Sequence, residues 1–204
     1  MKLLIAIPSL DYMHAEFVKS LTALVCRLKD EGIVFDVAIQ SGTLVYVARD
    51  KLAKKAINEG YSHVLWLDAD MVFRPDLLEV LTDSGKPFVV GICHSRREPY
   101  ASCLFKSIEP AERFTEYPHG TFEVAASGMA CALIKTDILR EVALQNYGSC
   151  FCPTRRLGED LAFCQRVHER GYKIYAEPMA WIGHIGHITI YPEMHDQYME
   201  AISR

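Results

Sequence analysis

Short apolar runs alternate with segments of helical periodicity along the first half of this chain, and this alternation constrains the fold more than any other feature. The runs have the length of buried strands and fall within residues 3–7, 33–39, 62–75 and 88–93. Between the first two, apolar side chains recur every three or four residues, as in a helix packed on a core. Strands joined by helices through short connections predict an α/β fold with a mostly parallel central sheet and helices on both faces.

The second half of the chain is less regular. Residues 94–120 carry scattered aromatics and prolines, which predicts an irregular excursion with one short strand, and we expect a small additional antiparallel element. The remaining predicted elements are strands at 122–126, 129–134 and 173–176, helices beginning at 136 and 159, and a last amphipathic helix from Glu193. A length of 204 residues fits a single domain, 1–204.

Composition narrows the class of protein. Half of the residues are hydrophobic and the formal net charge is -4, which is typical of an ordinary globular protein and argues against a nucleic-acid partner. The apolar start MKLLIAI is too short for a signal-peptide core or a membrane span, so we expect a cytoplasmic protein with no membrane span. Seven cysteines are an odd number, which favours reduced thiols, and the Cys150, Cys152, Cys164 and His168 spacing matches no common zinc site.

Two carboxylates, Asp68 and Asp70, end the apolar stretch SHVLWLDADMVFRP at residues 62–75. The carboxyl end of a parallel strand is where an open sheet presents its chemistry. In an extended chain, residues two apart point to the same side about 7 Å apart, so the spacing predicts that both carboxylates face one hard cation or its ligand.

Six segments, taken in order, resemble the GT-A glycosyltransferases, and specifically glycosyltransferase family two with its small virus- or phage-encoded relatives. They are AIPS, VARDKLAKKA, LWLDADMVF, ASGMACALIK, GEDLAFCQRVHERGYKIYAEP and GHIGH. The resemblance implies a single Rossmann-like GT-A domain, with a nucleotide-binding half at about 1–93 and an acceptor-binding half at about 94–204. It also implies a nucleotide-diphosphate sugar as donor, with a UDP-sugar favoured, and a glycan or glycoconjugate as acceptor.

The resemblance further implies a divalent cation, Mn²⁺ or Mg²⁺, that stabilises the charge on the departing diphosphate. It makes Asp70 the direct ligand, places Asp68 on the ribose or a metal-bound water, and lets His184 or His187 complete the site. A neutral imidazole ligand favours manganese. The alternative for each histidine is a hydrogen bond within the core.

For catalysis, the resemblance assigns Asp160 as the base that deprotonates the acceptor hydroxyl in an inverting reaction. It places the acceptor against Ser127, Gly128 and Glu159. The alternative for Glu159 and Asp160 is ordinary capping of a helix N-terminus.

The donor pocket is expected to use Arg49, in a segment where Asp50 replaces the commoner Asn. The residues expected to line the base and ribose are Pro8, Ser9, Gln40 and Ser41. Many relatives carry an acidic residue after the second strand to read uracil, and Gln40-Ser41 stands there in this chain.

Two other classes of protein use similar parts. A nucleotidyltransferase normally has a glycine-rich loop and a basic residue after the first strand, where this chain has Pro8-Ser9-Leu10-Asp11. A non-catalytic sugar-nucleotide-binding module is the third interpretation. The transferase interpretation makes a geometric prediction: Asp68, Asp70, Asp160 and His184 or His187 converge on one cleft.

Overall fold

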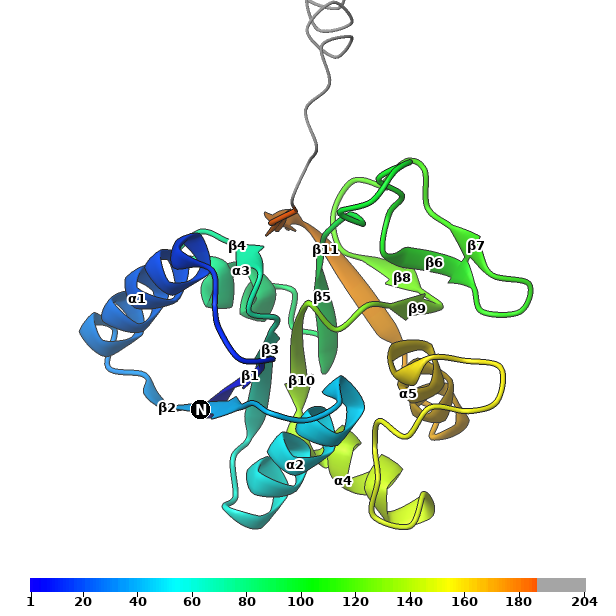
Figure 1. Ribbon diagram of the computed structural model, residues 1–204, viewed down its shortest axis with the longest axis horizontal. Coiled ribbons are helices and arrows are strands. Elements are labelled where there is room, and N and C mark those ends of the chain that lie inside the picture. The colour runs from blue at the N-terminus through cyan, green and yellow to red at the C-terminus, as the bar shows by residue number, and fades with distance from the viewer. Residues whose placement is uncertain (187–204) are drawn as a thin grey trace, which may run out of the picture.

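A computed structural model describes residues 1–186, and both His187 and the helix predicted from Glu193 lie outside the described residues. Figure 1 shows the arrangement of the elements. In chain order they are β1 (Lys2–Pro8), α1 (Ala15–Asp30), β2 (Val34–Gln40), α2 (Val45–Asn58), β3 (His63–Leu67), β4 (Met71–Val72), α3 (Leu77–Asp83), β5 (Phe88–Ile92), β6 (Leu104–Ser107), β7 (Glu112–Arg113), β8 (Phe122–Val124), β9 (Ala126–Ser127), β10 (Cys131–Lys135), α4 (Thr136–Gln145), α5 (Glu159–Glu169), β11 (Ile174–Trp181) and β12 (Gly183–His184).

Within residues 1–186, seven strands form the central sheet in the order β2-β1-β3-β10-β5-β11-β8. The strands β2, β1 and β3 pair in parallel, as do β5 and β11. The predicted α/β class with a mostly parallel sheet is therefore confirmed. The sheet is nevertheless mixed, because β10 runs antiparallel between β3 and β5, and β8 runs antiparallel to β11 at the edge.

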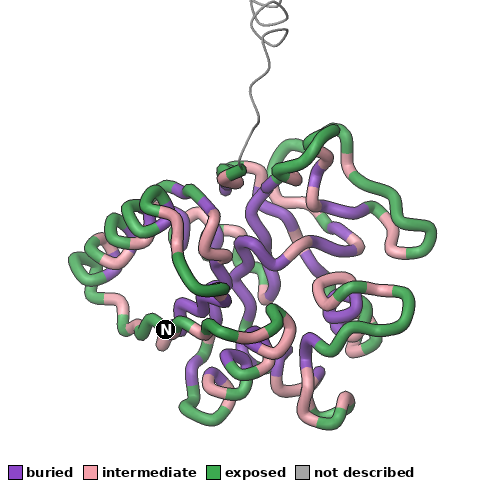
Figure 2. Tube along the Cα trace, in the orientation of Figure 1, coloured by how far each residue is buried: buried purple, intermediate pink, exposed green. Residues whose placement is uncertain are grey.

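Helices cover both faces of the sheet, as predicted. Alternate residues of β1 point to opposite faces, so that Leu3 and Ile5 belong to one core cluster and Leu4 and Ala6 to the other. The cluster around Leu3 includes apolar side chains of α1 and α3, and the cluster around Leu4 includes those of α2, α4 and α5. The buried strands lie between these two layers in Figure 2.

The order of the first three strands creates a natural place for a ligand. The chain passes from β1 to β2 on one side, and β3 then pairs with the other side of β1. At such a reversal the connections leave the sheet in opposite directions, and a crevice opens at the carboxyl ends of the strands. In this molecule that crevice lies beside Pro8, at the end of β1, and Asp68, directly after β3.

The stretch 62–75 does not form the single extended strand that the sequence suggested. The strand β3 ends at Leu67, and the chain then turns, with Met71 N donating to the carbonyl of Asp68 at 3.2 Å. The short strand β4 that follows pairs antiparallel with β12. The extended backbone predicted between Asp68 and Asp70 was therefore wrong, because the two residues lie at a turn, although both line one cleft.

The excursion at residues 94–120 holds more structure than the one strand predicted. The strand β6 pairs antiparallel with β7 and with β9, and an isolated bridge joins His94 to Ser102. This sheet confirms the expected antiparallel element. The run at 122–126 divides into β8 and β9, and the strand predicted at 173–176 continues to Trp181 as β11.

This arrangement predicts which thiols react in the folded protein. All seven cysteines are free, and burial raises the pKa of Cys131, Cys150 and Cys164 to about 12. Because alkylation requires an accessible thiolate, iodoacetamide should modify the exposed Cys26 and Cys152 and leave those three unmodified. Peptide mass spectrometry before and after unfolding in urea checks this. Native labelling of Cys164 at the rate of Cys26 would contradict the fold.

Candidate functional site

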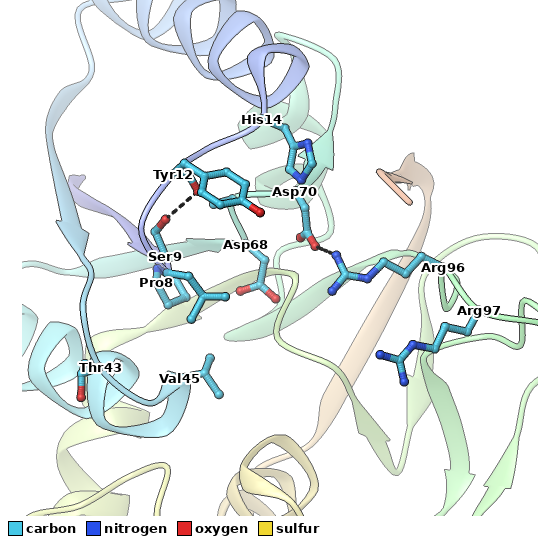
Figure 3. A pocket seen from close by; sticks show the side chains of 12 residues that line it. Pro8, Ser9, Tyr12, His14, Thr43, Val45, Asp68, Asp70, Arg96 and Arg97 are labelled. Atoms are coloured by element: carbon cyan, nitrogen blue, oxygen red, sulfur yellow. Dashed lines mark hydrogen bonds and ion pairs between the residues drawn. The ribbon is translucent and has the colours of Figure 1, made fainter. Parts of the chain in front are cut away.

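A cleft of about 490 Å³ lies at the reversal in strand order, at the carboxyl ends of β1 and β3. Pro8 and Ser9 form one wall, and Asp68 and Asp70 form another. Figure 3 shows Asp68, Asp70, Arg96 and Arg97 extending into the cleft from separate segments. The complete lining is Pro8, Ser9, Leu10, Tyr12, His14, Thr43, Val45, Asp68, Ala69, Asp70, Arg96 and Arg97.

Two helices begin at the rim of this cleft. His14 is the N-cap of α1, and Val45 is the first residue of α2. A helix N-terminus carries partial positive charge from its unpaired N–H groups, which favours an anionic ligand. Together with Arg96 and Arg97, these helix ends balance the negative charges of Asp68 and Asp70 in the same space.

Asp70 has two cationic or polar partners. Arg96 Nη1 forms an ion pair with Asp70 Oδ2, and His184 Nε2 lies 3.4 Å from the same oxygen. Burial opposes ionisation of this carboxyl, but hydrogen bonding to His184 and the charges of His184 and Arg96 hold the pKa of Asp70 below its ordinary value. The hydrogen bond to Asp70 in turn raises the pKa of His184.

The pairing of β12 with β4 brings His184 to this place from the far end of the described chain. His184 is opposite Met71 in that ladder, and Ile185 N donates to the carbonyl of Asp70 at 2.8 Å. A second contact fixes the orientation of the His184 ring on the side away from Asp70: Nδ1 lies 2.9 Å from the carbonyl oxygen of His94. A carbonyl oxygen only accepts, so Nδ1 carries a proton and Nε2 is directed at Asp70.

These two residues fit a divalent cation. A metal-binding histidine usually donates its second ring N–H to a carbonyl or carboxylate, as His184 does to His94. The 3.4 Å between Nε2 and Asp70 Oδ2 suits two neighbouring ligands of one ion whose bonds are each about 2.0–2.2 Å long. Among residues 1–186 no three His, Cys, Asp or Glu side chains gather as a ready-made metal site, so further ligands would have to come from a bound molecule or water.

A buried arginine joins the cleft to a second carboxylate. Arg49, on α2, is 2% exposed, and its Nη2 lies 3.1 Å from Asp68 Oδ1 and 3.2 Å from Asp68 Oδ2. Its Nε lies 3.6 Å from Asp160 Oδ1, and its Nη1 donates to the carbonyl of Met129 at 3.3 Å. Burial works against the charged guanidinium, yet the charges of Asp68, Asp160 and Glu159 raise the pKa of Arg49.

Asp160 occupies the first turn of α5 with a side chain 24% exposed. Burial raises the pKa of this carboxyl to about 6; the charge of Arg49 opposes the increase, and the charges of Glu159 and Asp68 add to it. Its Oδ1 is a buried atom with no hydrogen-bond donor among the described residues. Asp160 lies outside the lining of the cleft and is joined to Asp68 only through Arg49, so the predicted convergence of all four residues on one cleft is not met. A carboxyl whose pKa is raised to about 6 is nevertheless suited to accepting a proton.

The residues expected to contact an acceptor surround Asp160. A Cβ added at Gly128 would lie 3.7 Å from Asp160 Oδ2, so Gly128 packs directly against the carboxylate. Glu159 is partly exposed beside it. Ser127 is buried, and its hydroxyl donates to the carbonyl of Gly128 at 2.8 Å, so it lies beneath this surface.

The expected donor residues are divided by the structure. Pro8 and Ser9 line the cleft, whereas Gln40 and Ser41 lie outside its lining, where the Gln40 amide donates to the carbonyl of Ser41. Thr43 and Val45 line the cleft from the same segment instead. Arg49 does not line the cleft. It is buried and reaches the cleft only through its ion pair with Asp68.

Several other residues lie at the site. Tyr12 and His14 line the cleft without a role expected from the sequence, and the signal that could have indicated them is their position just after β1. Arg96 and Arg97, for which the sequence left open contact with phosphate or plain solvated surface, also line it. Asp50 has a structural role, since its carboxylate accepts from Ser149 Oγ and from the backbone N–H groups of Cys150 and Phe151. It thereby fixes to α2 the loop that leads into α5.

Comparison with known proteins supports the fold alone. No protein family model matches this sequence, and no curated protein matches it. Among solved structures, the fold is similar to that of A197 from STIV, with a TM-score of 0.62 and 18% sequence identity. The similarity covers 92% of this chain and 87% of that one.

The raised pKa of Asp160 predicts that Asp160→Asn stabilises the protein above neutral pH. The folded carboxyl titrates near 6 and an unfolded one near 3.8, so the stability that the protonated group contributes is lost as pH rises through 6. At pH 8 the ionised group costs of order 2–3 kcal/mol, which the neutral amide avoids. Urea denaturation should show a gain for Asp160→Asn at pH 8 that vanishes near pH 4.

Asp137→Asn is the matched control for this measurement. Asp137 also occupies the first turn of a helix, α4, but its side chain is 73% exposed. It should show no comparable gain at pH 8. Equal stability of the wild-type protein and Asp160→Asn at both pH values would mean that Arg49 fully compensates the buried charge.

Proposed function

We propose that this chain is a metal-dependent glycosyltransferase of the GT-A type, which moves a sugar from a nucleotide-diphosphate sugar to an acceptor hydroxyl with inversion of configuration. One observation carries the proposal: buried Arg49 joins Asp68, in a cleft suited to a diphosphate, to Asp160, a carboxyl that titrates near neutrality. A donor site and a base are thereby held next to one another by one rigid contact.

The charges of the cleft support a diphosphate with a cation. Arg96, Arg97 and two helix N-termini favour phosphate oxygens, whereas Asp70 and His184 favour a metal ion. When bound, Mn²⁺ or Mg²⁺ would act as a Lewis acid for the departing diphosphate, held by Asp70 and His184. The apolar side chains of Leu10, Tyr12 and Val45 give a nucleobase a surface to pack on. A UDP-sugar is the favoured donor by the resemblance of the sequence to family two.

Asp160 supplies the base of the proposed reaction. Its carboxylate removes the proton from the acceptor hydroxyl as the oxygen attacks the sugar carbon, and the bond from that carbon to the diphosphate breaks on the opposite side. Arg49 orients the carboxylate and limits the rise of its pKa, so that the base is ionised at neutral pH. Glu159 and Gly128 flank the approach of the acceptor.

The two alternatives lack comparable support. A nucleotidyltransferase needs a loop of glycines and a basic residue after its first strand, and this cleft has Pro8 and Ser9 there. A binding module has no need of a carboxyl whose pKa is raised to about 6 beside a buried arginine.

Analysis of the products distinguishes these functions. The protein is incubated with Mn²⁺, a panel of nucleotide-diphosphate sugars and candidate acceptors, and the released nucleotide is identified by chromatography. Free nucleoside diphosphate is expected for glycosyl transfer. Pyrophosphate would identify a nucleotidyltransferase, and binding without turnover of any donor would identify a binding module.

Removal of the base should abolish transfer and leave donor binding intact. Asp160→Asn is expected to lower kcat by about 10²-fold or more, because proton transfer typically contributes that much. The wild-type rate should fall as pH decreases through about 6, where Asp160 becomes protonated. Initial rates from pH 5 to 8, with Asp137→Asn as the control, measure both effects. Wild-type turnover by Asp160→Asn would remove this residue from the role of base.

The small number of protein ligands predicts that cation and nucleotide bind together. Asp70 and His184 alone should hold Mn²⁺ weakly, and a bound diphosphate should raise the Mn²⁺ affinity by roughly tenfold or more. By reciprocity, Mn²⁺ should raise the affinity for the nucleotide by the same factor. Isothermal titration with UDP and Mn²⁺, each with and without the other, measures this factor. His184→Ala should abolish it, and His63→Ala, at the opposite end of β3, should leave it unchanged. Binding of UDP that is indifferent to Mn²⁺ would contradict the prediction.

A further inference from the structure

We propose that Arg96 is the resting counter-ion of Asp70, and that it competes with the divalent cation for the same carboxylate oxygen. Cation binding then frees the guanidinium for the diphosphate of the donor in the same cleft. The competition stands on the geometry of Asp70, whereas the second step rests on the function proposed above.

The competition follows from the contacts of one atom. Asp70 Oδ2 is the oxygen that pairs with Arg96 Nη1, and it is also the oxygen nearest to His184 Nε2, at 3.4 Å. A cation held between that oxygen and the imidazole would lie against the guanidinium. A divalent cation on that oxygen would repel the adjacent guanidinium, and this repulsion favours departure of Arg96 from Asp70.

The backbone of Arg96 is fixed while its side chain is free to move. The segment is closed by the bridge between His94 and Ser102 and by Ser95 N donating to the carbonyl of Ala101 at 2.8 Å. Gly186 packs closely on Arg96, since a Cβ there would lie 3.1 Å from the Arg96 Cβ. The side chain itself is 46% exposed, so the guanidinium can leave Asp70 by rotation about its own bonds.

The cleft offers the released guanidinium a clear destination. Arg96 and Arg97 both line it, and Figure 3 shows the two side chains extending toward the interior from adjacent positions. Within residues 1–186 Arg97 has no ion pair with a carboxylate, unlike Arg96. Two neighbouring planar guanidinium groups match the oxygens of a diphosphate, which accept paired hydrogen bonds.

The proposal makes the two arginines differ in a measurable way. Arg96→Gln removes a competitor of the cation and a ligand of the diphosphate, so it should raise Mn²⁺ affinity and lower nucleotide affinity. Arg97→Gln removes only a ligand of the diphosphate. It should therefore lower nucleotide affinity and leave Mn²⁺ affinity unchanged. A general disturbance of the cleft would weaken both ligands.

The test is a titration of the whole chain with Mn²⁺ alone, followed by electron paramagnetic resonance, and then with UDP at saturating Mn²⁺, followed calorimetrically. Arg96→Gln should bind Mn²⁺ roughly threefold or more tightly than the wild-type protein, as loss of a partly exposed ion pair allows. Arg96→Lys, which keeps the charge without the planar fork, should lie between the two. Thermal unfolding of each variant establishes that it is folded.

The outcomes separate this proposal from the proposed function. Unchanged or weaker Mn²⁺ binding by Arg96→Gln overturns the competition, whether or not UDP binds. If Arg96→Gln binds Mn²⁺ more tightly but the wild-type protein binds no nucleoside diphosphate, the competition holds and the transferase function fails. If UDP binds equally well to the wild-type protein and Arg96→Gln, the release of Arg96 to the diphosphate is overturned.

Discussion

The buried charge of Arg49 must be paired, and its partners link the two halves of this molecule. The guanidinium of Arg49 is buried in the layer between the sheet and α2, where an unpaired charge would cost several kcal/mol. Its partners come from the turn after β3, the segment before β10 and the first turn of α5. Those elements lie in both halves of the sequence, so satisfying one side chain fixes the position of the cleft beside Asp68 relative to Asp160.

The reversal of strand order at β1 and β3 opens the cleft in which the charged groups gather. The crevice between the ends of β1 and β3 receives one helix N-terminus from each face of the sheet, those of α1 and α2, and two aspartates from the turn after β3. The helix N-termini alone are positive, and the aspartates alone are negative. Together they form a surface of both signs, complementary to a molecule that brings anionic oxygens and a cation at once.

The sequence predicted the positions of helices and strands, but not the direction of a buried strand or the burial of a charged side chain. Apolar periodicity located the helices and strands of the first half, because burial on one face leaves a local pattern. The direction of β10 was not predictable, since its buried run Cys131–Lys135 would read the same in either sense. Continuing hydrophobicity at Met71 and Val72 concealed the turn after Leu67. The sequence singled out Asp68, Asp70, Asp160 and His184 as candidates, but the burial of Arg49 and the ion pair of Arg96 arise only from tertiary packing.

The strand β12 has a consequence for how the protein is made. Asp70 emerges from the ribosome early, with β1, β2 and β3 already synthesised, yet the imidazole and the backbone N–H that hold it come from His184 and Ile185. More than a hundred residues of translation separate the carboxylate from those partners. Such a distant contact closes a long loop and forms late, so a nascent chain carries most of its core before Asp70 meets His184. The contact between Asp70 and His184 can thus form only after more than half of the described chain has been synthesised.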